Sequence, residues 1–136
     1  MIFDVKTLAT INLIAQAIIL ITVLVAVFLA RRKQFMRHCN IVRVAVAVQL
    51  LSIFLIMLPV MLGYIKNPRQ TAFQTEMLAH HSLGVLVILL WVYINLAFMG
   101  RVRLLGKLAI FMRSALSIWV LAFLFGLYLY VQTYVI

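Results

Sequence analysis

The sequence INLIAQAIILITVLVAVFLA at residues 11–30 carries no charge and runs directly into the basic triplet RRK at residues 31–33. An α-helix of about 20 residues is about 30 Å long, which matches the hydrocarbon thickness of a bilayer. Lys and Arg concentrate at the cytoplasmic ends of membrane-spanning helices. The stretch therefore predicts a helix that crosses a membrane with its C-terminal end in the cytoplasm.

Three further apolar runs follow the first. We expect four spans, at about residues 10–30, 43–65, 77–100 and 112–135. Across the chain 68% of residues are hydrophobic and 10% are charged, whereas soluble domains are about half apolar. Short connections make consecutive helices antiparallel neighbours. The sequence predicts an all-α integral membrane protein: a single membrane domain over residues 1–136, folded as an antiparallel, up-and-down bundle of four transmembrane helices.

The second span contains a proline, Pro59, in its later half. Proline lacks the N–H that an interior helical residue donates, and its ring crowds the preceding turn. We therefore expect the helix to bend there.

Basic residues are distributed unevenly between the two ends of the spans. The chain has 12 Lys and Arg against 2 Asp and Glu, a formal charge of +10. Nine bases fall on the predicted cytoplasmic side and three on the other; the nine are Arg31, Arg32, Lys33, Arg37, Arg43, Arg101, Arg103, Lys107 and Arg113, and the three are Lys6, Lys66 and Arg69. This asymmetry predicts that both termini lie outside the cytoplasm. Because the bases flank apolar runs, they indicate contact with anionic membrane lipid and not with nucleic acid.

Polar side chains within the spans are few and are expected to face other helices. Asn12 and Gln16 lie four residues apart, on one face of the outer half of the first span. Gln49 and Ser52 are expected in the cytoplasmic half of the second span, level with the later polar residues Asn95, Ser114 and Ser117. Two interpretations stay open: hydrogen bonds between helices, or the lining of a site for a polar headgroup or a quinone-like ligand.

The three histidines lie at opposite ends of the spans. His80 and His81 open the third span at the outer face, whereas His38 precedes the second span at the cytoplasmic face, where we expect it to contact lipid headgroups. About 30 Å of hydrocarbon separates the two levels, so one metal or haem cannot take ligands from both. Adjacent helical residues point about 100° apart. At most one of His80 and His81 therefore faces the bundle, and the other meets lipid headgroups or a partner.

Several residues near the outer face are candidate ligands for haem or copper. They are His80 and His81 with Glu76, and the methionines Met57, Met61 and Met77. Thioether and imidazole together suit Cu(I) or a His/Met haem. Glu76 stands four residues before His80 and could orient it by a hydrogen bond. An interfacial histidine pair that binds no cofactor, or only a partner chain, is an equal alternative.

Side-chain catalysis is not expected. Asp4 and Glu76 are the only acids and lie far apart, so no carboxylate pair is available. Cys39 is the single cysteine and has no third partner beside His38. The chain also lacks a glycine-rich phosphate loop.

Four segments carry a resemblance to a known family. They are RRKQFMRH at 31–38, SIFL at 52–55, LAHH at 78–81, and the run from Met112 to Tyr130 that contains Trp119 and Gly126. Over about residues 30–131 the chain resembles the small four-helix prokaryotic membrane family catalogued as domain of unknown function number 420, which includes CtaM-like haem–copper oxidase maturation factors. The Leu-x-x-His spacing matches His81 to the family position, whereas the small residue Gly84 matches His80.

The chain departs from that family at two positions. Members usually carry a histidine ahead of the last span and a proline before its tryptophan, whereas this chain has Lys107-Leu108 and Ser117-Ile118-Trp119. The resemblance implies an accessory or assembly subunit of a respiratory or other membrane metalloenzyme complex, in a prokaryotic cytoplasmic membrane. The alternatives are a purely structural, lipid-binding subunit of a larger complex and, ranked lower, a haem b electron carrier to quinone.

Overall fold

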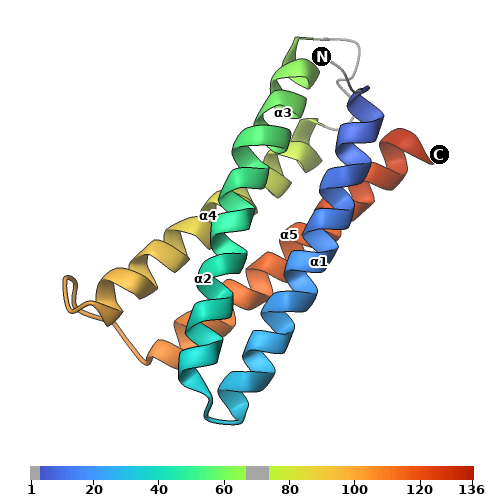
Figure 1. Ribbon diagram of the computed structural model, residues 1–136. Helices are drawn as coiled ribbons and strands as arrows, with labels where there is room; N and C mark the ends of the chain where they lie inside the picture. The colour runs from blue at the N-terminus through green and yellow to red at the C-terminus, as the bar shows by residue number, and fades with distance from the viewer. Residues whose placement is uncertain (1–3, 67–73) are drawn as a thin grey trace. The chain divides into compact units, whose positions relative to one another are not determined.

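The computed structural model describes residues 4–66 and 74–136, and every regular element in them is helical (Figure 1). The elements are α1 (Val5–Arg31), α2 (Phe35–Ser52), a π-helical segment η1 (Ile53–Met57), α3 (Leu58–Ile65), α4 (Gln74–Phe98) and α5 (Leu108–Tyr134). Four stretches are long and apolar enough to cross a membrane: Val5–Arg31, Phe35–Gly63, Thr75–Phe98 and Leu108–Tyr134. The protein is therefore a multi-pass membrane protein whose helices contact lipid.

The chain forms two compact units, Met1–Thr71 with Tyr134–Ile136, and Ala72–Thr133. We call α1 to α3 the first hairpin and α4 with α5 the second hairpin.

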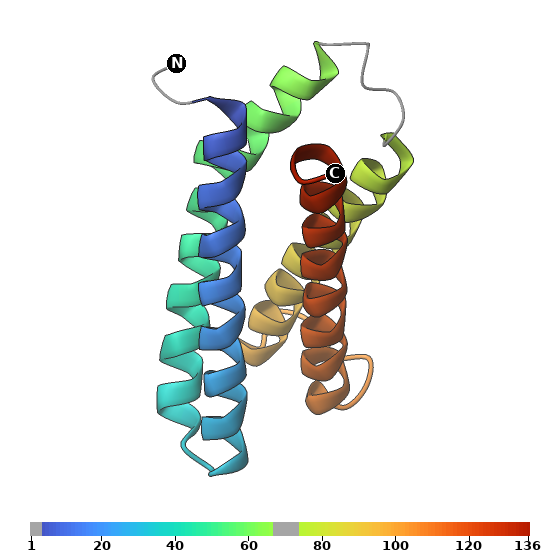
Figure 2. The ribbon, with the colours of Figure 1, turned by 90° about the vertical axis from the view of Figure 1, so that its right-hand side faces the viewer.

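In the first hairpin, α1 and α2 run antiparallel and side by side (Figure 2). Ile19, Val23 and Ala26 of α1 are buried at a helical spacing. Ile14, Ile18, Ile21 and Val25 lie on the opposite face and are exposed. A helix with large apolar side chains on both faces is suited to lipid on one side and protein on the other.

The second apolar run is not one regular helix. The Leu58 N–H bonds to the carbonyl of Ile53, five residues back, so the backbone is π-helical over Ile53–Met57. Pro59 follows at once; it has no N–H for the carbonyl of Leu55, four residues back. Figure 2 shows α3 turned away from the line of α2. The bend predicted from Pro59 is confirmed, and the π-helical form is a finding of the structure.

Two helices end in the same hydrogen-bonded cap but use different residues. After α1, the Lys33 N–H bonds to Ala30 O at 3.0 Å and the Gln34 N–H to Leu29 O at 3.0 Å. After α4, the Gly100 and Arg101 N–H groups make the equivalent bonds, to Ala97 O and Leu96 O. This cap needs a left-handed residue, φ +71° at Gly100 and +62° at Lys33. Lysine costs about 1 kcal/mol more than glycine in that conformation.

In the second hairpin, α4 and α5 also run antiparallel, because residue 80 contacts residue 122 and the ring of Tyr93 meets that of Phe111. The Tyr93 hydroxyl organises the connecting loop: it donates to Arg103 O at 3.2 Å and accepts from the Leu105 N–H at 3.0 Å. The α4–α5 connection is thereby fastened to α4 by one side chain.

Candidate functional site

The candidate site centres on His80, whose imidazole reaches from α4 to the backbone of α5. Its Nδ1 lies 2.8 Å from the carbonyl oxygen of Ala122. A carbonyl only accepts, so Nδ1 must carry the proton in this bond. The neutral ring then leaves Nε2 with a free lone pair. A backbone carbonyl on Nδ1 is the arrangement by which proteins fix the tautomer of a metal-binding histidine.

Gly126 makes room for this ring. A β-carbon placed on Gly126 would lie 2.9 Å from His80 Cε1, closer than unbonded carbons approach, and 3.3 Å from Nδ1, which is a tight contact. Gly126 is one helical turn beyond Ala122, so both residues lie on the same face of α5. Together they form a notch for His80. Neither was predicted as a site residue, although the pattern Ala-x-x-x-Gly is a known signal for close helix packing in membranes.

His81 takes a different direction from His80. Its Nδ1 lies 2.7 Å from the carbonyl of Met77 on its own helix. The two rings meet edge to face, with centroids 5.3 Å apart and planes at 88°. One histidine of the pair thus reaches the neighbouring helix and the other lies along α4. Which of the two faces the bundle stays a prediction. His81 also presents an unprotonated Nε2 when neutral.

The other predicted ligands are only partly brought together. Met77 shares a face of α4 with His80 and His81, at a spacing of three and four residues. Ala122 and not Glu76 supplies the hydrogen bond that orients His80. Met57 ends η1 and Met61 lies in α3; both belong to the first hairpin, so their place beside the histidines stays a prediction.

The prediction that His38 contacts lipid headgroups is wrong. Its side chain is only 7% exposed, and its Nδ1 lies 2.8 Å from the carbonyl of Ala26 on α1. The reason is that α2 begins at Phe35, well before residue 43 where the apolar run starts. His38 is therefore inside the helix and faces α1, where the small side chain of Ala26 leaves the carbonyl accessible.

Polar residues of α1 and α2 form a cluster in the first hairpin. The Ser52 hydroxyl donates to Asn12 Oδ1 at 2.7 Å and accepts from Gln16 Nε2 at 3.3 Å. Asn12 and Gln16 share a face as predicted. Ser52, however, lies at their level and not in the half of the second span next to the α1–α2 turn, again because α2 begins earlier than the apolar run. In the second hairpin Asn95 bonds to its own helix, at Trp91 O.

The donor set near His80 fits some metal groups and not others. Within residues 4–66 and 74–136, no group of three or more His, Cys, Asp or Glu side chains could hold a metal ion, so a closed zinc-type site is not formed there. An imidazole from His80 or His81 together with the thioether of Met77, one helical turn away, suits Cu(I), and a single imidazole suits one axial position of a haem. His80 would hold the group through Nε2.

No family model, curated protein or solved structure matches the chain. The resemblance to the four-helix maturation factors therefore remains a prediction from the four quoted segments.

Proposed function

We propose that the protein is a small accessory or assembly subunit of a respiratory or other metalloenzyme complex in a prokaryotic cytoplasmic membrane. His80 would hold haem or copper near the outer face, with His81 and Met77 beside it. In this proposal the two hairpins pack as one up-and-down bundle with both termini outside. The resemblance to CtaM-like maturation factors of haem–copper oxidases supports the choice of complex.

One observation carries the proposal: a backbone carbonyl holds His80 Nδ1–H while Gly126 clears space for the ring. Such a histidine is already oriented, so binding at Nε2 costs little conformational entropy. In this proposal the Ala122 carbonyl fixes the tautomer of His80, and Gly126 has no side chain that would occupy the space of the ring. The imidazole of His81 lies beside that of His80. Bound haem or copper would supply redox chemistry or be the cargo that is delivered.

The test is to purify the full chain and measure haem by the pyridine haemochrome spectrum and copper by metal analysis. We expect His80→Ala to lose the bound group, because it removes the anchored Nε2, and His81→Ala to weaken it. His38→Ala is the matched control, since His38 has the same carbonyl bond at a different place. Neither haem nor copper in the wild type, together with normal oxidase maturation in the double variant His80→Ala/His81→Ala, would refute the cofactor role.

A second candidate is a purely structural subunit that binds lipid and fills space in a larger complex. The observation in its favour is that the carbonyl bonds of His38 and His80 each fasten two helices together, which is sufficient reason for these side chains to be there. Co-purification separates the two candidates. A stable stoichiometric partner with no haem or copper favours the structural subunit.

A further inference from the structure

The turn between α1 and α2 carries a dense group of bases. Arg31, Arg32, Lys33 and Arg37 lie within seven residues and are all exposed. Of the two acids in the chain, Asp4 stands at the opposite end of α1, about 40 Å away along a helix of this length, and Glu76 belongs to the second hairpin. In the described part of the chain none of the four bases pairs with a carboxylate. The four bases are therefore available to an anionic group from outside the chain.

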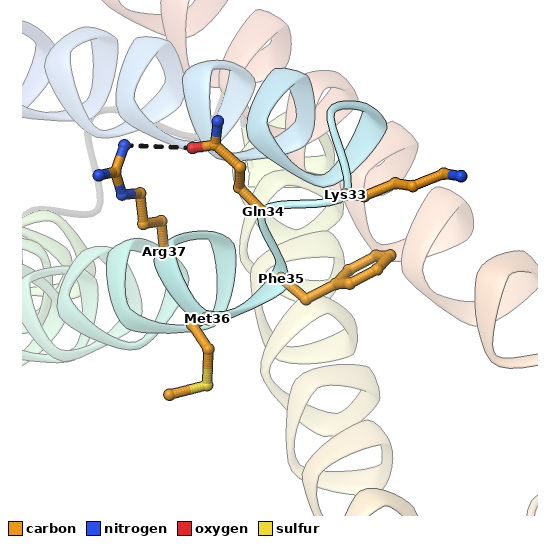
Figure 3. A pocket seen from close by; sticks show the side chains of 5 residues that line it. All are labelled: Lys33, Gln34, Phe35, Met36 and Arg37. Carbon is orange, nitrogen blue, oxygen red and sulfur yellow. Dashed lines mark hydrogen bonds between the residues drawn. The ribbon is translucent and has the colours of Figure 1, made fainter.

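A shallow hollow of about 370 Å³, wide open to the outside, lies at this turn and is lined by Lys33, Gln34, Phe35, Met36 and Arg37 (Figure 3). Figure 3 shows the Lys33 and Arg37 side chains extending away from one another, to opposite sides of the turn. Arg37 Nη1 donates to Gln34 Oε1 at 3.2 Å, which restrains the guanidinium. Arg32 is held as well, 4.5 Å above the ring of Phe28.

Apolar side chains lie beside these cations and are not covered. Phe35 is 61% exposed and Met36 is 80% exposed. The uncharged run ends at Ala30, so a membrane-spanning α1 places the turn at headgroup depth. A phospholipid offers both complements there: a phosphate for the bases and an acyl chain for the apolar side chains. Free phosphate offers only the first.

Lys33 adds a second argument. The equivalent cap after α4 uses glycine, the residue that suits a left-handed conformation best, whereas this cap uses lysine at φ +62°. An unfavourable residue at a position that glycine fills easily indicates that its side chain has a use. At this turn, what the Lys33 side chain adds and glycine lacks is a positive charge.

We propose that the α1–α2 turn is a specific site for an anionic phospholipid, whose phosphate is attracted by the exposed bases of the turn, Lys33 on one side and Arg37 on the other, and whose acyl chain passes Phe35 and Met36. This site is independent of the histidines. It predicts a preference for phosphatidylglycerol over phosphatidylcholine that depends on these two cations. It differs from the general attraction of any basic loop to an anionic surface because it depends on these two positions.

The test is native mass spectrometry of the full chain in detergent, titrated with phosphatidylglycerol and, separately, with phosphatidylcholine. We expect Lys33→Gln and Arg37→Gln each to weaken phosphatidylglycerol binding about fivefold, the effect of removing one charge at a membrane surface. The matched control is Arg101→Gln/Arg103→Gln in the α4–α5 loop, which should bind as the wild type does. Equal losses in the control would show diffuse attraction and overturn the proposal.

Lys33→Gly separates the charge from the fold. It removes the ammonium but gives the cap its preferred residue, so the thermal midpoint should be unchanged or higher while phosphatidylglycerol binding falls about fivefold. Wild-type binding in this variant would overturn the proposal. So would displacement of the lipid by inorganic phosphate at equal concentration, because the site would then be one for a free anion.

Discussion

At the scale of single residues, the contact between His80 and Gly126 is the feature most open to measurement. Gly126→Ala places a methyl group 2.9 Å from the imidazole, so the ring must move and its bond to Ala122 lengthens or breaks. Overpacking of this kind costs about 1–3 kcal/mol. We expect a lower thermal midpoint in detergent and weaker retention of any group bound at Nε2.

The control for this substitution is Gly84→Ala on α4, where an added β-carbon meets nothing within 4 Å. It should be neutral or stabilising by up to about 1 kcal/mol, because alanine is the better helix former. A double-mutant cycle completes the test. In the His80→Ala background the cost of Gly126→Ala should disappear; an unchanged cost would show that another neighbour, and not the imidazole, fills the notch.

At the scale of elements, the α4–α5 loop depends on the Tyr93 hydroxyl. Tyr93→Phe leaves the Leu105 N–H and the Arg103 carbonyl without this partner while the ring contact with Phe111 is kept. Losing one such hydrogen bond lowers the free energy of unfolding by about 1 kcal/mol. We expect faster trypsin cleavage after Arg101, Arg103 or Lys107, with cleavage in the α1–α2 turn as an internal reference. Equal cleavage of wild type and variant would contradict a fastening role.

The elements also show what the sequence can predict. Runs of uncharged residues predicted four helices because membrane burial of a backbone requires internal hydrogen bonds over the whole span. These runs put the start of α2 too late, because Arg37 and His38 are polar and yet belong to the helix. The predicted positions of His38 and Ser52 along the helix were therefore wrong as well. The contact of His80 with Ala122 and Gly126 could not be predicted from the sequence, because hydrophobic periodicity describes one helix and does not give the register between two helices.

At the scale of the whole molecule, the testable property is orientation in the membrane. Nine bases against three predict that both hairpin turns lie in the cytoplasm and both termini outside.

Labelling of single cysteines in intact cells measures this orientation. In a Cys39→Ser background, Asp4→Cys and Val135→Cys should react with a membrane-impermeant maleimide, whereas Gln34→Cys and Lys107→Cys should react only after the cells are opened. The reverse pattern would place the α1–α2 turn on the outer surface. The histidine pair at the start of α4 would then lie at the cytoplasmic face, and a partner that loads or receives haem or copper there would have to be cytoplasmic.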